Sequence, residues 1–291
     1  MRTAIRQNNA VGLLLPGLLL LALLGAIAVE TDIVRIPHFG ATLPAPELVA
    51  IAPRAYTYRA VGDFLLDGAP VDGPRVAVEE PASLEIMKFQ VSIADYTECV
   101  ADGACRKAEP RRRGKGSSLP VTGVSFTDAT DYAAWLSART GATWRLPTVA
   151  EWTFAAGSKA RDNALGFETD SRDPSERWLA FYEKEALLGD NALATPEALG
   201  SGGLNEFGVA DVSGAVWEWT STCSARTTLD SAGNTRAFLE SCGIRYLEGK
   251  HRTAMSYFVR DALGGGCTVG APPDNLGFRL VRDPTWLERL L

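Results

Sequence analysis

The sequence predicts a single α+β domain over about residues 54–288. Three segments carry apolar side chains at helical spacing between recognisable start and stop signals. Short strand-like runs are scattered between them, and long loops rich in Gly, Ser, Asn and Asp join these elements. A chain of 291 residues with this apolar content can bury a sizeable core. Neither an internal repeat nor a clear linker divides the region, so we expect one domain.

The N-terminus has the features of an export segment, assigned to residues 1–29. Arg2 and Arg6 precede an apolar run over residues 10–29, and its Ala-Ile-Ala triplet is typical of a signal-peptide cleavage site. The same run is long enough to span a bilayer, so a cleaved signal peptide and an inner-membrane anchor both stay open. Either alternative places the rest of the chain in the periplasm or another extracytoplasmic compartment. Residues 30–53, rich in Pro and Ala, are expected to form an extended lead-in.

The early part of the domain contains a predicted hairpin and the first helix. Between Phe64 and Val78, short apolar runs alternate with Asp-Gly pairs, which favour tight turns. A helix is predicted to begin at Ser92, because apolar side chains follow it at helical spacing and Gly103 lies just beyond the end.

Two further helices are predicted from their faces and ends. The segment Thr127–Arg139 places its apolar side chains on one face and is followed by Gly141. The next helix begins at Thr148, where Glu151 completes a capping box, and Gly157 ends it.

The stretch Phe207–Thr222 stands out within residues 158–250, whose composition otherwise predicts irregular structure. It begins as a loop in which Asp211 can cap a turn and Gly214 can adopt a positive φ. It continues as a run in which tryptophans alternate with Val, Glu and Thr, a pattern typical of a half-buried strand. Asp211 and Glu218 are thereby expected to lie near each other.

The cysteines indicate disulfides, because bridges persist outside the cytoplasm. Cys99 and Cys105 flank an Asp-Gly turn that can bring their sulfurs together, so we predict a bridge between them. Cys223, Cys242 and Cys267 leave at least one thiol unpaired, and their pairing stays open.

The charge balance narrows the classes of partner. The formal net charge is −6 at pH 7, which gives no reason to expect nucleic acid or an anionic membrane surface as partner. A local basic run between Arg106 and Lys115 sits among Pro and Gly residues, where a solvated loop is the favoured interpretation.

Four ordered blocks of the chain resemble the formylglycine-generating enzyme (sulfatase-modifying factor) family. They are Pro120–Phe126 with Asp128, Arg145–Thr148 with Glu151 and Trp152, Asn205–Gly208 with Val216–Thr220, and Asn275–Arg279. The resemblance implies a single C-type-lectin-like domain with little regular secondary structure. Within the family, the chain is most similar to the accessory proteins of copper nitrite reductases (the NirV type).

The resemblance also implies that the chain lacks the copper site and the iron site of its oxidative relatives. Formylglycine formation in the family uses a pair of cysteines that binds copper(I), and the corresponding positions here hold Ala254 and Val259. The related sulfoxide synthases hold iron with three histidines, whereas this chain has only His38 and His251. We therefore expect neither active site.

A calcium site is implied by the same resemblance, at Asp211, Gly214, Val216 and Glu218. Calcium takes carboxylate and carbonyl oxygens of the kind that this loop can present. The alternative is that Asp211 caps a turn and Glu218 pairs with an arginine.

Residues 249–267 would form the wall of the family's cleft. Five side chains supply positive charge and aromatic area there: Lys250, His251, Arg252, Tyr257 and Arg260. Such a set can bind a peptide segment or an anionic group, and it is equally typical of an ordinary polar loop.

Two functions from different classes follow. The first is a non-catalytic accessory or binding protein for a periplasmic partner, such as a copper nitrite reductase. The second is an oxidoreductase acting on a protein cysteine or a small thiol, with atypical metal ligands drawn from Cys223, Cys242, Cys267 and His251.

Overall fold

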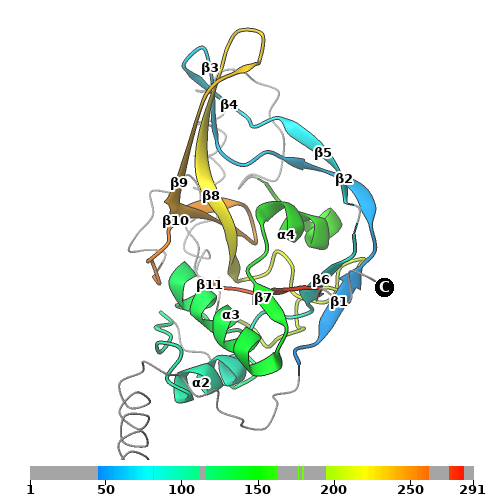
Figure 1. The fold of residues 1–291 in the computed structure, drawn as a ribbon, viewed down its shortest axis with the longest axis vertical. Coiled ribbons are helices and arrows are strands. Elements are labelled where there is room, and N and C mark those ends of the chain that lie inside the picture. The colour runs from blue at the N-terminus through cyan, green and yellow to red at the C-terminus, as the bar shows by residue number, and fades with distance from the viewer. Residues whose placement is uncertain are drawn as a thin grey trace, which may run out of the picture. The chain divides into compact units, whose positions relative to one another are not determined.

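Helices and sheets pack together in the part of the chain that the computed structural model describes, namely residues 45–80, 82–111, 116–162, 176, 179, 195–261 and 275–284 (Figure 1). All of these residues lie within one unit, Leu43–Leu291. The predicted export segment, residues 1–29, lies outside them. Across the described ranges, no helix has both the length and the apolar character needed to cross a membrane.

The three predicted helices are confirmed: α2 (Ile93–Ala101), α3 (Phe126–Thr140) and α4 (Val149–Ala156). A 3-10 turn, η1 (Gly157–Lys159), extends α4. Each helix begins where a Ser or Thr hydroxyl accepts from a backbone N–H three residues on, so the N-terminal donors are satisfied locally. The left-handed φ of 72° at Gly141 ends α3, as expected of a glycine C-cap.

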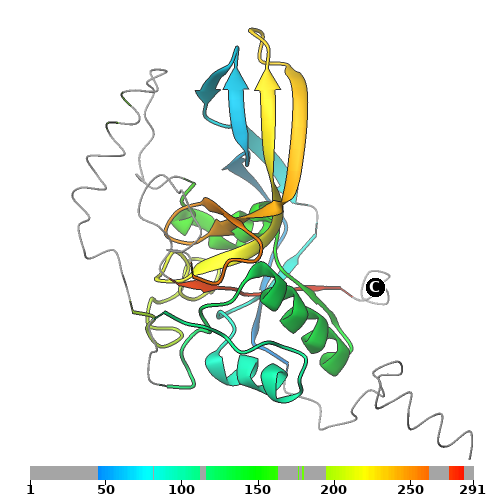
Figure 2. The same cartoon turned by 90° about the vertical axis from the view of Figure 1, so that its left-hand side faces the viewer.

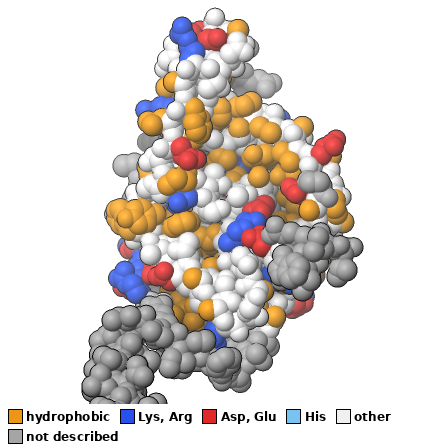
Figure 3. Space-filling view, viewed as in Figure 1, with side chains coloured by type: hydrophobic (Ala, Val, Ile, Leu, Met, Phe, Trp, Pro, Cys, Tyr) orange, Lys and Arg blue, Asp and Glu red, His pale blue; other side chains and the backbone are white. Residues whose placement is uncertain are grey.

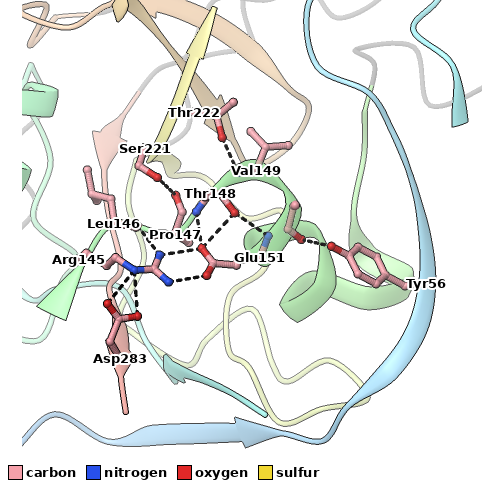
Figure 4. A network of polar contacts seen from close by, with 11 residues as sticks. Tyr56, Arg145, Leu146, Pro147, Thr148, Val149, Glu151, Ser221, Thr222 and Asp283 are labelled. Carbon is pink, nitrogen blue, oxygen red and sulfur yellow. Dashed lines mark hydrogen bonds and ion pairs between the residues drawn. The ribbon is translucent and has the colours of Figure 1, made fainter. Parts of the chain in front are cut away.

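Arginine and carboxylate side chains tie the start of α4 to two strands (Figure 4). Glu151 completes the capping box of α4 and also accepts from Arg145 Nη2 at 2.5 Å. Arg145 ends β7 (Thr143–Arg145), and its Nε donates to Asp283 Oδ1 at 3.0 Å, at the end of β12 (Val281–Asp283). The predicted capping box is therefore also a tertiary contact.

A four-stranded sheet has the order β1-β6-β12-β7. Its outer strand β1 (Leu48–Ile51) pairs antiparallel with β6 (Leu84–Met87). β1 precedes residue 54, so the ordered domain includes part of the predicted lead-in 30–53. Proline-rich flanks conceal this strand in the sequence, and Ile51 is buried in the core.

A long hairpin corrects the expectation that residues 158–250 are irregular apart from a short strand. It consists of β8 (Trp217–Leu229) and β9 (Thr235–Glu248), which stand side by side in both views (Figures 1 and 2). The outer half of β9, residues 235–244, is exposed on both of its faces. Because no core selects apolar residues there, the alternating pattern that reveals a half-buried strand is missing.

Further strands join the hairpin into a sheet of order β10-β9-β8-β3-β4. β3 (Asp63–Leu66) and β4 (Ala69–Val71) form the predicted early hairpin around Asp67 and Gly68, both with positive φ. β10 (Thr253–Ser256) extends the other edge of this sheet.

The predicted hairpin between Phe64 and Val78 is confirmed only in its first half. β5 (Arg75–Glu80) pairs with β2 (Arg54–Arg59) in a separate two-stranded sheet instead. Residues of that sheet line a cavity.

A short parallel pairing brings two of the four sequence blocks together. β11 (Leu276–Gly277) pairs with the start of β8, with Leu276 opposite Trp217 and Gly277 opposite Glu218. Trp217, Trp219, Tyr132 and Phe278 are all buried in one apolar cluster around this contact. The inner end of β8, which carries Glu218, is thus at the centre of the domain.

Candidate functional site

Glu218 lies at the centre of a buried polar network at the inner end of β8. Its Oε1 accepts from Gln90 Nε2 at 2.8 Å and from Arg279 Nη2 at 2.7 Å. Its Oε2 accepts from Trp152 Nε1 at 2.8 Å and from Arg279 Nε at 2.6 Å. Glu218 and Arg279 are both 1% exposed. Each carboxylate oxygen therefore has two donors, which fills the acceptor positions that a carboxylate offers.

Arg279 uses its remaining N–H groups on backbone carbonyls. They donate to the carbonyl oxygens of Lys88 and Ala210, each at 3.0 Å. The guanidinium thus neutralises Glu218 and joins three separate segments of the chain. Such a pair is costly to break, because removing one partner leaves an isolated charge in the interior.

Asp211 holds the preceding loop together. It adopts a positive φ of 56°, and its carboxylate accepts from the backbone N–H of Gly200 at 2.6 Å and of Gly202 at 2.8 Å. Gln90 Nε2, which donates to the Glu218 carboxylate, also donates to the backbone carbonyl oxygen of Asp211 at 3.4 Å. Asp211 and Glu218 are therefore close to a shared neighbour, as the sequence predicts.

The contacts of Asp211 and Glu218 are those of the alternative interpretation, a turn cap and an arginine pair. A calcium ion at Asp211, Gly214, Val216 and Glu218 would need at least one oxygen of Glu218, and both are already saturated by nitrogen donors. The guanidinium of Arg279 also places positive charge beside that carboxylate. In this arrangement Glu218 does not fit as a calcium ligand. Calcium binding at residues 211–218 stays a prediction.

The five residues predicted to line one cleft contact different parts of the domain. The Lys250 ammonium lies 5.3 Å from the centre of the Trp217 ring. Arg252 Nε donates to Glu248 Oε1 at 2.5 Å. Arg260 belongs to another part of the domain, where it donates to Glu109 Oε1 at 2.8 Å. It also bonds the α3 residue Asp128.

The two remaining cleft residues differ sharply in exposure. His251 is 6% exposed, and its ring stands edge-on to Trp217 with centroids 5.5 Å apart. Trp217 Nε1 donates to the carbonyl of His251 at 3.1 Å. Tyr257 is 44% exposed and contacts Phe258 edge-on. The described residues of 249–267 therefore do not assemble all five side chains into one binding surface.

Two disulfides change how the cysteines are interpreted. The predicted Cys99–Cys105 bridge is confirmed, with Cα atoms 5.3 Å apart. A second bridge joins Cys223 in β8 to Cys242 in β9. These two sulfurs and Glu240 form a group of potential metal ligands, but sulfurs bonded to each other cannot serve as thiolates. Cys267, the fifth cysteine, lies outside the described residues.

The family follows from the match of one domain profile to most of the chain. The sulfatase-modifying factor enzyme 1-like domain matches residues 39–284. The chain belongs to this family. The predicted α+β, C-type-lectin-like fold is confirmed, as a single domain of this type with few helices and mainly sheet.

Curated relatives of this sulfatase-modifying factor domain include proteins named as active and as inactive. It is 32% identical over 165 residues to the inactive C-alpha-formylglycine-generating enzyme 2 of Mus musculus, covering 55% of this chain and 48% of the relative. It is 30% identical over 186 residues to the formylglycine-generating enzyme of Mycobacterium tuberculosis, covering 57% of this chain and 58% of the relative. The chain spans about half the length of the curated relatives it matches.

A solved structure supports the fold. PvdO from Pseudomonas aeruginosa superposes with a TM-score of 0.51 at 21% sequence identity, covering 86% of this chain and 100% of that chain. At this identity the likeness shows the fold alone.

The two positions that the family resemblance assigns to copper-binding cysteines lie on and beside β10 of this sulfatase-modifying factor domain. Ala254 is in β10, opposite Tyr246 of β9. Val259 is 7% exposed and packs in the main apolar cluster. A methyl and an isopropyl group offer no ligand atom, and the core contacts of Val259 give that side chain a packing role.

Sequence reasoning assigned no role to two charged residues that matter most here. Arg279 stood in the last sequence block, but its buried partner is 61 positions away. Glu248 lies directly opposite Glu218 across β8 and β9 and is also 1% exposed. Burial raises the pKa of Glu248 to about 7, although the nearby Arg252 opposes this shift. Neither burial nor pairing was visible without the long hairpin.

Proposed function

We propose that this chain is a non-catalytic binding protein that keeps the sulfatase-modifying factor fold without its oxidative chemistry. The observation that carries this proposal is the pair Ala254 and Val259 at the positions that the resemblance assigns to copper ligands. Copper(I) prefers soft sulfur ligands, which neither side chain provides. The packing of Val259 in the core supports a lasting structural use of that position.

The names of the relatives are consistent with this proposal but do not decide it. The Mus musculus relative is named inactive, whereas the Mycobacterium tuberculosis relative is named an enzyme. The two are similarly distant from this chain, so the residues at positions 254 and 259 carry the argument instead.

The proposed setting is the periplasm, either free or anchored through residues 10–29. The apolar N-terminal segment supports export, and the two disulfides are the kind of bridge that persists in an oxidising compartment. The proposed partner is an exported protein or peptide segment, with a copper nitrite reductase suggested by the resemblance to its accessory proteins. Maturation or stabilisation of that partner would then be the biological role.

The alternative function, an oxidoreductase with atypical metal ligands, depends on four candidate ligands, and two of them are not available as thiolates. Cys223 and Cys242 are bonded to each other, and Cys267 lies outside the described residues. His251 remains, and a single histidine cannot form a stable redox metal site. The described residues therefore offer no observation that favours this function.

The test of the missing chemistry is a direct assay. The full chain is incubated with a sulfatase-type cysteine peptide, copper and oxygen, with the Mycobacterium tuberculosis enzyme as positive control. We expect no conversion of the peptide cysteine to the aldehyde beyond a no-protein control. Conversion above that control, measured by peptide mass, would refute the proposal.

A pair of variants checks the alignment on which the proposal depends. Ala254→Cys/Val259→Cys should gain tight copper(I) binding, and Ala254→Cys alone should not, because the site needs two thiolates. Absence of any gain in a folded double variant would contradict the assignment of these positions.

The partner is tested with purified proteins. The full chain and a copper nitrite reductase from the same cell are combined, and complex formation is measured by calorimetry and by size-exclusion chromatography. We expect a stoichiometric complex, with another exported copper protein as negative control. Equal binding to both, or to neither, would reject the nitrite reductase as the specific partner.

A further inference from the structure

A cavity of about 610 Å³ is lined by none of Glu218, Gln90, Trp152 and Arg279. Its wall combines β2, the end of α4 with η1, the loop at residues 206–207, and the segment from Glu248 to Arg252. This volume is in the range of pockets that hold small molecules or a few peptide side chains. The sequence does not reveal this cavity, because its wall is built from segments that lie far apart in the chain and include Arg75 of β5.

Arginines dominate the charged residues of this cavity. The five arginines are Arg54, Arg59, Arg75, Arg161 and Arg252, and the three acidic residues are Asp162, Glu206 and Glu248. On the face seen in Figure 3, basic and acidic side chains lie interspersed. The chain as a whole is acidic, with a formal charge of −6. The overall composition of this acidic protein therefore does not explain why arginines outnumber carboxylates in this cavity.

The three carboxylates of the cavity are already engaged. Asp162 Oδ2 accepts from Arg59 Nε at 3.0 Å, and Glu248 Oε1 accepts from Arg252 Nε at 2.5 Å. The oxygens of Glu206 accept from the backbone N–H and the hydroxyl of Ser158, at 2.7 and 3.0 Å, and the Glu206 charge partly offsets the lowering of the Arg54 pKa by burial. Among the described residues, Arg54 and Arg161 form no ion pair with a carboxylate, and their side chains donate to backbone carbonyls instead.

Arg54 is the first of these. Its guanidinium is stacked between the rings of Phe154 and Phe207, 3.9 and 4.0 Å from their centres. Nη2 donates to the carbonyl of Phe154, whereas Nη1 is buried without a hydrogen-bond partner in the described structure. A buried N–H group without an acceptor costs free energy, so this arrangement favours a ligand that supplies one.

Arg161 is the second. Its Nη1 donates only to the carbonyls of Ser158 and Ala160, at 3.0 and 2.9 Å, and the residue is exposed toward solvent. Arg59 and Arg75 are cross-strand partners in register between β2 and β5, and the carboxylates of Asp162 and Asp72 lie 3.0 and 4.0 Å from the Arg59 guanidinium. The exposed guanidinium of Arg161 and the unsatisfied Nη1 of Arg54 are therefore the two groups that favour a negative ligand.

We propose that this cavity binds a ligand through a carboxylate or phosphate group that is contacted by Arg54 and Arg161. The planar fork of a guanidinium matches the two oxygens of either anion. Arg54 lines the cavity and its Nη1 has no acceptor among the described residues, so an anion bound there would satisfy it. The phenol rings of Tyr56 and Tyr58 line the same cavity and offer contact area to the rest of the ligand. This site does not depend on the missing copper chemistry or on the proposed partner.

The test uses isothermal titration calorimetry on the full chain at low ionic strength, with inorganic phosphate in one arm and succinate in the other. We expect saturable binding of one or both anions, and the responding arm identifies the group as phosphate, carboxylate or either. Sodium chloride at matched ionic strength serves as the reference. No saturable heat with both anions would overturn the proposal.

Three variants locate the binding. Arg54→Gln and Arg161→Gln should each weaken the anion by about tenfold or more, since a charge-assisted hydrogen bond contributes about 1.5–3 kcal/mol. Arg236→Gln is the matched control, because Arg236 is exposed on β9 outside the cavity. If Arg54→Gln fails to fold, Arg161→Gln still decides. Wild-type affinity in the folded cavity variants, or an equal loss in Arg236→Gln, would overturn the proposal.

Discussion

Glu218 and Glu248 are direct partners across β8 and β9, yet their surroundings differ. Both are 1% exposed. Glu218 has four nitrogen donors, two of them from Arg279, and no oxygen to spare. Glu248 receives an ion pair from Arg252 and lines the arginine-rich cavity. The two glutamates of this register pair therefore differ: the acceptor positions of Glu218 are all filled, whereas Glu248 lines a cavity.

The different hydrogen-bond partners of the two glutamates indicate which buried charge has a structural role. A carboxylate whose four acceptor positions are filled from three other segments holds those segments together and is poorly placed to take part in binding. A carboxylate at a cavity wall, with its pKa raised to about 7 mainly by burial, can exchange protons near neutral pH. We therefore assign a structural role to the Glu218 network and expect the charge of Glu248 to change with pH near neutrality.

The largest expected effect comes from breaking the saturated pair. Arg279→Met leaves the Glu218 charge buried without its main partner, and we expect the free energy of unfolding to fall by about 3–5 kcal/mol. The matched variant Arg252→Met should cost less, because Glu248 can take up a proton when its arginine is removed. Urea denaturation at pH 7 measures both. Equal losses in the two variants would erase the proposed distinction.

A second variant sharpens the same comparison. Adding Glu218→Gln to Arg279→Met removes the isolated charge, so part of the lost stability should return. Failure to recover any stability would mean that packing around Arg279, and not the charge on Glu218, accounts for the loss.

The next effect is a pH dependence that belongs to Glu248. Its pKa is raised from about 4.5 to about 7 in the folded chain, so the folded state holds this proton more tightly than the unfolded state. The stabilisation is fully present below about pH 4.5 and is lost as the pH rises through 7. Arg252, Asp162 and Glu218 are the charged groups that act on it.

Comparison with Glu248→Gln isolates this effect. The free energy of unfolding of wild type minus that of Glu248→Gln should fall between pH 5 and pH 8, by on the order of 1–3 kcal/mol. Subtraction cancels the titration of groups that the substitution leaves unchanged. A difference that stays constant, or that grows with pH, would contradict the raised pKa.

The smallest expected effect concerns calcium. Because Glu218 has no free acceptor position, we expect the melting temperature of metal-free protein to be nearly the same with calcium and with chelator. The calcium site implied by the family resemblance predicts the opposite, since an ion that binds only the folded state raises the melting temperature. A calcium-dependent rise that disappears in both Asp211→Ala and Glu218→Ala would establish that site and show that calcium displaces the arginine contacts.

Local features of this protein were determined by the sequence alone. The starts of α2 and α4 at Ser92 and Thr148, the end of α3 at Gly141, and the Cys99–Cys105 bridge were all predictable. In each case the decisive contact joins residues at most six positions apart. A capping hydroxyl or a short disulfide loop leaves its mark in a few consecutive residues, so no knowledge of the rest of the chain is needed. The sequence blocks likewise indicated the family.

Only the tertiary structure decided the roles of the charged residues. Arg279 reaches Glu218 across 61 positions, and Arg54 and Arg161 line the same cavity although they are far apart in the sequence. The long hairpin that sets Glu218 beside Glu248 was missed, because its outer half has no buried face to impose an alternating pattern. Charge pairing and burial depend on which segments meet in space. That information is carried by the packing of the whole chain and not by any short stretch of it.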